Sequence, residues 1–416
     1  MIEMLRKHAE HIARSAIAAV LPDVAVKEAL GNVKFPGRVY VVAVGKAAWK
    51  MASSAAECIP DNIASGIVIT KYGHVEGRIP GMICLEAGHP VPDENSFEAT
   101  AKAIDLVKDL TEQDTVLFLL SGGGSALFER PVINPEELQD ITKQLLACGA
   151  DIVEVNTIRK RLSYVKGGRF AKICEPAQVR AIVLSDIIGD PLDMIASGPV
   201  TQDVSTCDDA VRIAEKYGLR LSEKAYRFLR IETPKEISNV TVQITGSVKQ
   251  LCAAAAVQSK ALGYEPIILT DRMNCQAKEA GSFLASILKT HEDTEKPLAF
   301  IAGGETVVKL TGKGKGGRNQ ELVLAAAVGI EGLRNAAVIS VGSDGTDGPT
   351  DAAGGYVDGE TITSLQGKGL SVYQTLMDND AYHALKAVDG LIMTGPTGTN
   401  VNDVSIGLVI PKNKQL

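Results

Sequence analysis

An apolar run that ends in three consecutive glycines places the strongest constraint on the fold. Residues 115–120 carry no charge, and glycines 122–124 follow one residue later. A short apolar run bounded by a turn signal is typical of a strand buried on both faces of a sheet. The glycines allow a sharp turn with uncovered backbone N–H groups, and a helix is expected to begin near Ser125. Such a turn can hold an anion, although close packing of small residues explains this turn, taken alone, slightly better.

Strand-like runs recur along the chain, and helix-like segments alternate with them. Strands are expected at residues 39–44, 66–70, 82–86, 115–120, 179–184, 240–245, 266–270, 298–302, 336–341 and 405–410. Residues 306–310 are expected to form a hairpin with 298–302. Regular alternation of this kind predicts an α/β fold with mainly parallel sheets.

The length of the chain predicts two domains. It has 416 residues, whereas single hydrophobic cores rarely grow beyond roughly 250–300 residues. The alternation breaks near residues 231–235, so the expected domains are 1–235 and 236–416. Hydrophobic residues make up 45% of the chain and charged residues 22%, which is ordinary for a globular protein.

Charge and cysteine usage exclude several classes of partner. The net charge of −7 disfavours a large surface for nucleic acid or an anionic membrane, and no run is long and apolar enough to predict a membrane span. The seven cysteines form no C-x-x-C pair, which favours reduced, buried thiols. The N-terminal helix lacks the features of a signal peptide, so a cytoplasmic protein is expected.

Small and ionisable residues gather where the expected strands end. Ligands of α/β proteins bind outside the carboxyl ends of the strands, so these positions are the candidate site. They hold Gly45-Lys46, Ser121 to Ser125, Ser185-Asp186 with Gly189-Asp190, Gly303-Gly304-Glu305, and residues 342–351. Together they predict one phosphate-handling site built from many loops.

Each of these loops offers chemistry that suits a phosphate. Lys46 adds a positive charge at a strand-to-helix turn, although a solvated lysine explains that position equally well. Asp344, Asp347 and Asp351 lie among glycines, and Asp186 contributes a carboxylate from another loop. Carboxylates beside phosphates are the usual ligands of Mg²⁺, while Asp-Gly is also plain turn chemistry.

Residues 311–321 form a glycine loop with a high density of cations. Glycines 312, 314 and 317 match G-x-G-x-x-G, but Lys313, Lys315 and Arg318 stand among them, and no acidic ribose ligand follows. A polyphosphate therefore suits this loop better than a nicotinamide cofactor. The chain contains neither a P-loop nor the protein-kinase signatures, so phosphoryl transfer would use another fold.

A second basic stretch covers residues 156–169. Asn156 and Arg159 fall on one face of the expected helix, with Lys166 a turn further, and Arg159 could hold a carboxylate with two hydrogen bonds. A solvated basic face explains this composition better. The six histidines show no metal-ligand spacing.

Several motifs resemble those of the type II glycerate 2-kinase family, whose C-terminal part is the MOFRL domain. In the first half of the chain they are residues 45–48, 120–127, 154–160, 166–169, 185–191 and 196–200. In the second half they are residues 303–306, 316–321, 345–354 and 397–403. The resemblance covers nearly the whole chain, in the family's order. It implies an N-terminal Rossmann-like doubly wound domain and a C-terminal MOFRL domain with a mixed sheet, with the active site in the cleft between them.

The resemblance also implies the activity: transfer of phosphate from ATP, with Mg²⁺, to D-glycerate, with the 2-hydroxyl as the expected acceptor. The family's proposed catalytic lysine and arginine match Lys46 and Arg318, and Asp190 is the candidate proton acceptor. The expected nucleotide contacts are Ser121, Gly122, Gly123, Gly124, Ser125, Gly303, Gly304, Glu305, Lys313, Lys315, Gly316, Gly317 and Asn319. Asn156, Arg159 and Lys166 are expected to bind substrate, and Asp186, Asp344, Asp347 and Asp351 to bind metal.

The sequence leaves two alternative functions open. Members of the family have been labelled hydroxypyruvate reductases, but the sequence lacks a well-placed dinucleotide fingerprint. A nucleotide-binding module without catalysis is the second alternative. The expected partners are small molecules, with no nucleic acid and no membrane, and a homodimer remains an open alternative.

Overall fold

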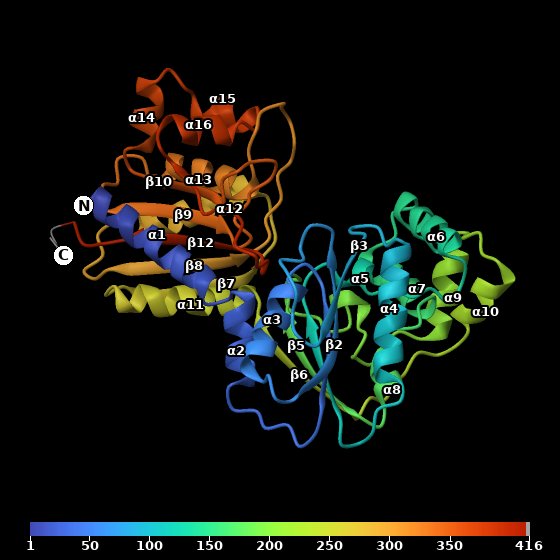
Figure 1. The fold of residues 1–416 in the computed structure, drawn as a ribbon. Helices are drawn as coiled ribbons and strands as arrows, with labels where there is room; N and C mark the ends of the chain where they lie inside the picture. The colour runs from blue at the N-terminus through green and yellow to red at the C-terminus, as the bar shows by residue number, and fades with distance from the viewer. Residues whose placement is uncertain (413–416) are drawn as a thin grey trace. The chain divides into compact units, whose positions relative to one another are not determined.

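A computed structural model describes residues 1–412 of the chain (Figure 1). The chain forms two compact units. The first unit comprises Ala25–Thr245, and the second unit comprises Met1–Val24 together with the chain from Gly246 onward. Each unit has its own six-stranded sheet.

The first unit alternates strands and helices as the sequence predicts. Its strands are β1 (Val39–Val44), β2 (Ile63–Lys71), β3 (Met82–Ala87), β4 (Thr115–Leu120), β5 (Gln178–Leu184) and β6 (Val240–Gly246). Its helices are α2 (Pro22–Leu30), α3 (Ala48–Cys58), α4 (Glu94–Val107), α5 (Gly124–Leu127), α6 (Pro135–Ala147), α7 (Ile152–Arg161), α8 (Arg169–Cys174), the 3-10 turn η1 (Ile195–Ser197), α9 (Cys207–Lys216) and α10 (Glu223–Leu229).

The sheet of the first unit has the strand order β3-β2-β1-β4-β5-β6, which is that of a doubly wound dinucleotide-binding fold. The pairs β2–β3, β1–β2, β1–β4 and β4–β5 are parallel. Every residue of β4 is buried, because helices cover both faces of the sheet. Helices α2 and α3 lie on one face, and α4, α5 and α8 lie on the other. The strand order reverses between β1 and β4, where such folds bind ligands.

Helices α6, α7, α9 and α10 form a smaller apolar cluster of their own. The start of α7 is fixed by a capping box. Asp151 accepts hydrogen bonds from the N–H groups of Val153 and Glu154, both at 2.9 Å, and Glu154 accepts one from Asp151 in return. This cap sets where α7 begins and therefore where its last turn, with Arg159, is placed.

The second unit contains the remaining elements. Its helices are α1 (Ile2–Ala18), α11 (Val248–Ala261), α12 (Ala277–Thr290), α13 (Arg318–Gly329), α14 (Thr361–Gly367), α15 (Val372–Met377) and α16 (Ala381–Ala387). Its strands are β7 (Glu265–Met273), β8 (Leu298–Gly304), β9 (Ala336–Gly342), β10 (Gly354–Asp358), β11 (Leu391–Ile392) and β12 (Asp403–Val409).

The sheet of the second unit is mixed, with the order β11-β10-β9-β12-β8-β7. Strand β12 is antiparallel to both of its neighbours, β8 and β9, whereas β7 and β8 are parallel. The first residue of β12, Asp403, therefore pairs with the last residues of β8 and β9, Gly304 and Gly342. Both the α/β class and the mixed second sheet are as predicted.

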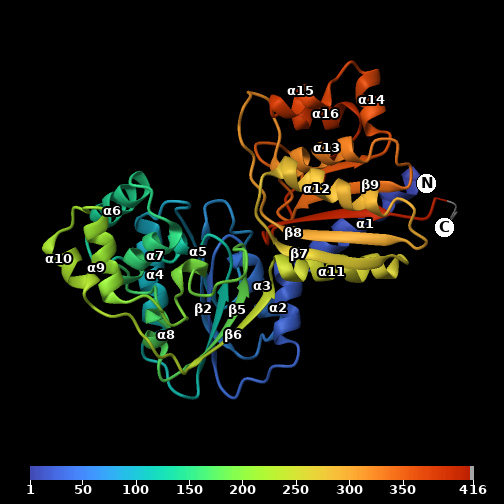
Figure 2. The same ribbon diagram turned by 180° about the vertical axis from the view of Figure 1, so that it is seen from behind.

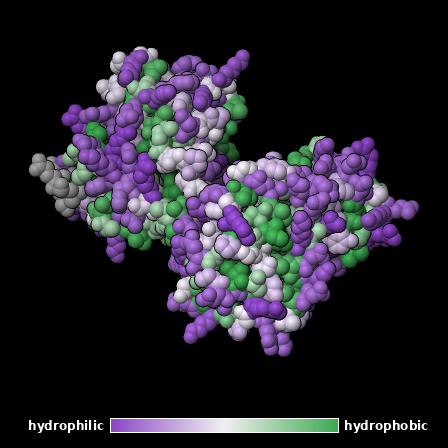
Figure 3. Space-filling model, viewed as in Figure 1, coloured by the Kyte–Doolittle hydropathy of each residue, from purple (hydrophilic) through white to green (hydrophobic). Residues whose placement is uncertain are grey.

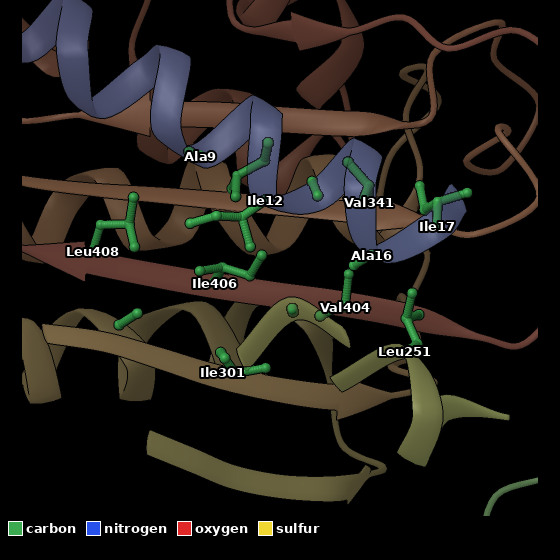
Figure 4. Packing of buried hydrophobic residues seen from close by; sticks show 14 of the residues in the cluster. Ala9, Ile12, Ala16, Ile17, Leu251, Ile301, Val341, Val404, Ile406 and Leu408 are labelled. Carbon is green, nitrogen blue, oxygen red and sulfur yellow. The ribbon is translucent and has the colours of Figure 1, made fainter. Parts of the chain in front are cut away.

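The N-terminal helix α1 packs on the second sheet, beside α11, although the rest of that unit follows some 220 residues later. Figure 4 shows Ile12 and Ala16 of α1 facing Val341, Val404 and Ile406 of the sheet. Helices α12 and α13 cover the opposite face, as Figures 1 and 2 show. Alternate residues of β8, β9 and β12 thus enter separate cores, which is why these strands are largely apolar.

Three sequence-based expectations differ from the structure. The break near residues 231–235 does not separate the units, because β6 lies beside β5 in the first sheet. The first residues belong with the second unit, so the units are not two consecutive segments. The hairpin expected at residues 306–310 is wrong, since only Val307 makes a bridge there, to Gln276.

Most of the face visible in Figure 3 is hydrophilic, with smaller hydrophobic groups among the polar residues. Within residues 1–412, no helix combines the length and the apolar character needed to cross a membrane.

Candidate functional site

The ends of β1 and β4 meet at the switch point of the first sheet. The N–H of Lys46 donates to the carbonyl of Gly122 (2.9 Å), and the N–H of Ala47 donates to Ser121 Oγ (3.0 Å). Gly45 has a φ of +120°, and a Cβ at this position would lie 2.3 Å from Ser121 Oγ. A glycine is therefore required for the two loops to approach this closely.

The glycines that follow β4 bring ionisable side chains against the loop. A Cβ on Gly122 would lie 2.2 Å from Asp186 Oδ2. A Cβ on Gly123 would lie 3.0 Å from His89 and 3.3 Å from Lys46 Cγ. The backbone thus touches groups from three other strand ends, and no side chain stands between them.

Two lysines beside His89 make this corner of the first unit positive. Burial lowers the pKa of His89, and the charges of Lys46 and Lys71 lower it further. Lys71 is the last residue of β2, and His89 follows the end of β3. An anion at this corner would therefore meet two ammonium groups and a neutral imidazole.

A cavity of about 280 Å³ lies beside this loop. Its walls include residues 121–126, His89, Arg159, Asp186 and Met194. Arg159 Nη2 donates to the carbonyl of Ser125 (3.2 Å), while its Nε is buried and has no hydrogen-bond partner among the described residues. The loop expected to bind phosphate and the arginine expected to bind substrate therefore share one cavity.

Lys166 supports this loop from beneath. Its side chain is fully buried, and its ammonium group donates to the carbonyls of Ser125 and Phe128, both at 2.9 Å. It also pairs with Glu129 at 2.8 Å, and burial lowers its pKa to about 8. These contacts favour a structural role over the substrate contact expected from the sequence.

Asn156 is also held by the protein. Ser197 Oγ donates to Asn156 Oδ1 (3.0 Å), and Asn156 Nδ2 contacts Met194 Sδ at 3.6 Å. Ser197 Oγ in turn lies 3.3 Å from Ser125 Oγ. Asn156 thus connects α7 to the wall of the cavity.

The alternative of a solvated basic face on residues 156–169 is wrong. Lys160, Arg161 and Lys166 are nearly or fully buried. Lys160 pairs with Asp193 and Asp203, both at 3.2 Å, and the charge of Lys160 lowers the pKa of Asp203 against the effect of burial. Buried cations need such partners.

Asp190 lies on the loop that follows β5, as does Asp186. Its backbone has a φ of +53°, which is uncommon for a residue other than glycine. Its Oδ1 is buried, and no hydrogen-bond partner for it is found among residues 1–412. An unsatisfied carboxylate oxygen on a strained turn can accept a proton or a hydrogen bond from a ligand.

In the second unit, Arg318 lies at the first position of α13 and faces the end of β8. Its Nη2 donates to Asp403 Oδ1 (3.0 Å), its Nε donates to Asp403 Oδ2, and its Nη1 donates to Glu305 Oε1 (2.8 Å). Burial would lower the pKa of Arg318, but its bonds to Asp403 and the charge of Glu305 raise it overall. Its guanidinium is thus charged and held by two carboxylates.

Asp347 caps α13. Its two oxygens accept hydrogen bonds from the N–H groups of Asn319 (3.1 Å) and Gln320 (2.9 Å). A Cβ on Gly317 would lie 2.2 Å from Asp347 Cγ. Burial raises the pKa of Asp347, although these N–H groups oppose the shift. The start of α13, expected to face a phosphate through Asn319, is occupied by the protein's own carboxylate.

Asp403 is almost fully buried beside Arg318. Burial raises its pKa to about 6, because the opposing effect of Arg318 is smaller and the charge of Asp347 adds to the increase. A Cβ on Gly342 would lie 3.4 Å from both Asp344 Oδ1 and Asp403 Oδ1. Asp344 and Asp403 are therefore close to each other at the edge of the second sheet.

The basic glycine loop packs against the segment between α15 and α16. A Cβ on Gly312 would lie 2.3 Å from Asp378 Cα, and one on Gly314 would lie 2.4 Å from Asp380 Cβ. Lys315 Nζ lies over the ring of Tyr382, 4.5 Å from its centre, and the N–H of Lys313 donates to Asp378 (3.4 Å). The glycines of this loop thus serve close packing. Gly316 adjoins Asn379 and Ala381 in the same way.

The three aspartates of the second unit that are expected to bind metal each have other partners within that unit. Tyr382 donates to Asp351 (2.8 Å), Asp347 caps α13, and Asp344 accepts a bond from the N–H of Thr346 (2.9 Å). Asp186 lies in the first unit, against Gly122. In the part of the chain that the structure describes, no three His, Cys, Asp or Glu side chains are arranged to hold a metal ion.

Two residues of the site were not predicted. His89 follows β3, a strand end that carries the same kind of signal as the others: Gly88 followed by an ionisable residue. Asp403 is the first residue of β12, and because β12 is antiparallel to both neighbours, Asp403 lies at the edge where β8 and β9 end. The motif at residues 397–403 contains Asp403 and was the available signal.

The fold and the loops define a two-unit α/β protein with a small-ligand cavity at the switch point of one sheet and a carboxylate-held arginine at the edge of the other. Residues 8–230 match the family model of a domain of unknown function, DUF4147, and residues 298–403 match the MOFRL family.

Similar proteins match nearly the whole chain. D-glycerate 2-kinase from Thermotoga maritima is 52% identical over 98% of this chain and 99% of its own. Glycerate 2-kinase from Pyrococcus horikoshii is 42% identical over 90% of this chain and 88% of its own. The crystal structure of a glycerate kinase from Thermotoga maritima, 52% identical, superposes with a TM-score of 0.95 over 98% of this chain and all of that one. The chain belongs to the glycerate kinase family with a C-terminal MOFRL domain.

Proposed function

We propose that this protein is a kinase that transfers phosphate from ATP to D-glycerate, giving 2-phosphoglycerate and ADP. The main support is the 52% identity, over nearly the full length of both chains, to a protein named D-glycerate 2-kinase. The site supports the same chemistry, since Lys46 and Arg318 place cations at strand ends in the two units and a glycine loop follows β4 beside a cavity in the first unit. The 2-hydroxyl as acceptor rests on the names of the relatives.

The cavity of the first unit is the proposed site for D-glycerate. Its volume of about 280 Å³ suits a small molecule, and Arg159 offers a guanidinium to a carboxylate. The glycine loop turns backbone toward the same space, which would let a phosphoryl group approach without side-chain interference. Asp190 has an unsatisfied oxygen and is the proposed acceptor of the hydroxyl proton.

Lys46 is the proposed source of positive charge in the first unit. Its backbone is fixed by Gly122, and its side chain passes along Gly123. Phosphoryl transfer depends mainly on positioning and on neutralising the charge of the transferring group. A lysine beside an uncovered loop can supply that charge.

Arg318 is the proposed source of positive charge in the second unit. The bonds to Asp403 and Glu305 use three N–H groups, and a guanidinium has five, which leaves two for phosphate oxygens. A third of its side chain is exposed (33%). Asp403 and Glu305 therefore orient the group without enclosing it.

Magnesium fits the residues present as a partner of the nucleotide. Mg²⁺ is usually held by one or two carboxylates together with phosphate oxygens, and it does not require a cage of protein ligands. Asp344 lies at the edge of the second sheet and would supply such a carboxylate, whereas both oxygens of the neighbouring Asp403 are bound by Arg318. When bound, the ion neutralises charge on the phosphates. Asp347 and Asp351 are engaged elsewhere.

A comparison of two reactions on one preparation tests the proposal. We expect ADP release with ATP and D-glycerate, and no oxidation of NADH with hydroxypyruvate. NADH oxidation without ADP release would favour a reductase. Nucleotide binding without turnover of either substrate would favour a non-catalytic module.

A further inference from the structure

The second unit contains an apolar cavity of about 450 Å³ that has no role in the proposed reaction as described above. Leu269, Met273 and Cys275, from β7 and the segment after it, form one side. Phe283 and Leu284 of α12 and the buried Leu322 of α13 also line it. Cavities of about 300–1,000 Å³ with mostly apolar walls are typical of small-molecule sites.

Irregular pairing of β7 accompanies this cavity. β7 is an edge strand, and its register with β8 shifts between Ile268 and Thr270 and again between Thr270 and Met273. Each shift adds one residue to β7 relative to β8. Such bulges occur preferentially at sheet edges and next to active sites, because they redirect the chain.

Two residues that line the cavity, Met273 and Leu322, lie close to Arg318 and its partner Glu305. The N–H of Glu305 donates to the carbonyl of Met273 (2.8 Å), and Glu305 also binds Arg318. Leu322 lies one turn after Arg318 on the same face of α13, about 6 Å along its axis at 1.5 Å per residue. One wall of the cavity therefore lies within about one helical turn of Arg318.

We propose that this cavity holds the nucleoside of the phosphoryl donor, with its phosphates directed toward Arg318. This rests on the proposed function, in which Arg318 meets the phosphates. A purine is flat and largely apolar, and Phe283 can stack on it at the rim. The amide of Asn274 and the hydroxyl of Thr270 also line the cavity and offer hydrogen bonds to its polar edge.

The thiol of Cys275 reports directly on occupation of the cavity. Cys275 is exposed and lines it, whereas Cys148 is exposed in the first unit and serves as an internal control. The rate at which each thiol reacts with iodoacetamide is measured by peptide mass spectrometry. ATP, adenosine and inorganic tripolyphosphate are added separately, with ATP at a concentration that saturates turnover.

ATP and adenosine should slow labelling of Cys275 several-fold and leave Cys148 unchanged, while tripolyphosphate should leave both unchanged. Equal protection by tripolyphosphate, or no protection by ATP and adenosine, would overturn the proposal. If the protein does not turn over ATP with D-glycerate, the proposed function fails, and the adenosine measurement still decides whether the cavity binds a nucleoside.

A matched pair of variants tests the stacking residue. Phe283 and Tyr373 are both 67% exposed in the second unit, so neither substitution should disturb the core. Phe283→Ala should weaken binding of a non-hydrolysable ATP analogue about tenfold, since aromatic stacking on a base has that order of effect, and should leave tripolyphosphate binding unchanged. Tyr373→Ala should change neither. An altered oligomeric state of Phe283→Ala with unchanged ATP binding would assign this surface to a protein contact and overturn the proposal.

Discussion

Replacing Asp403 by asparagine separates the catalytic role of Arg318 from its role in the fold. Asp403 accepts hydrogen bonds from two nitrogens of Arg318, and asparagine keeps the shape but offers only one acceptor oxygen and no charge. Glu305 would still hold Arg318 Nη1. The guanidinium should therefore remain near the site but lose its fixed orientation.

The structure gives the size of the expected effects. Misplacement of a catalytic group by about 1 Å costs on the order of 100-fold in rate, so kcat should fall by about that factor, with KM for ATP changed much less. The substitution lowers kcat, but it is not expected to lower the stability of the fold at neutral pH. The folded pKa of Asp403, about 6, lies above its ordinary value of 3.8. The unfolding free energy therefore falls by about 3 kcal/mol as pH rises through that interval.

Asp403→Asn should lack this fall, so its melting temperature at pH 8 should be no lower than that of the wild type. Its kcat should also lose the decline below about pH 6 that protonation of Asp403 causes in the wild type. Steady-state kinetics and thermal unfolding on the same preparations, from pH 5 to 8, check both results. A near wild-type kcat would refute the orienting role, whether or not the melting temperature changes. Glu305→Gln, at the more exposed partner, is the control and should lower kcat less.

Three further substitutions test other parts of the site. Arg318→Lys should lower kcat by about 10³-fold or more, because charge remains but the fork that binds two oxygens is lost; a nearly silent variant would remove Arg318 from the reaction. Lys46→Ala should lower kcat by orders of magnitude with little change in melting temperature, and an unchanged kcat in the folded variant would contradict its role. Lys166→Met should cost about 3–5 kcal/mol of unfolding free energy, because Glu129 is left buried and unpaired, and Glu129→Gln combined with Lys166→Met should recover most of it. A fully stable Lys166→Met with a raised KM for D-glycerate would instead support substrate contact.

Much of the architecture could be read from the sequence because strands buried on both faces are continuous apolar runs. The run before glycines 122–124 became β4, and the turn after it reached the switch point as the parallel-sheet rule predicts. The unit to which α1 belongs could not be predicted, because helix periodicity shows that α1 has an apolar face but not which sheet that face covers.

The candidate site could be predicted only in part from the sequence, for a related reason. Glycine signals a close approach of the backbone, but it does not reveal what approaches. At Gly122 and Gly123 the neighbours are Asp186, His89 and Lys46, whereas at Gly312 and Gly314 they are the backbone and Cβ of Asp378 and Asp380. The same residue type thus lines a cavity in one loop and serves packing in the other.

Charged residues that look alike in the sequence also differ in role because they differ in burial. Arg159 lines a cavity, whereas Arg161, two positions later, is fully buried and bonded to Ser205. The direction of a strand mattered in the same way, since Asp403 reaches the site only because β12 is antiparallel. Pairing and register depend on contacts between distant residues, which local patterns do not contain.

The identity of the product tests the central claim most directly. Incubation of the protein with ATP, Mg²⁺ and D-glycerate, followed by ³¹P and ¹H NMR, shows which hydroxyl carries the new phosphate. The proposed function predicts 2-phosphoglycerate together with an equal amount of ADP. Formation of 3-phosphoglycerate would contradict the assigned position, and the absence of any phosphoglycerate would contradict the kinase.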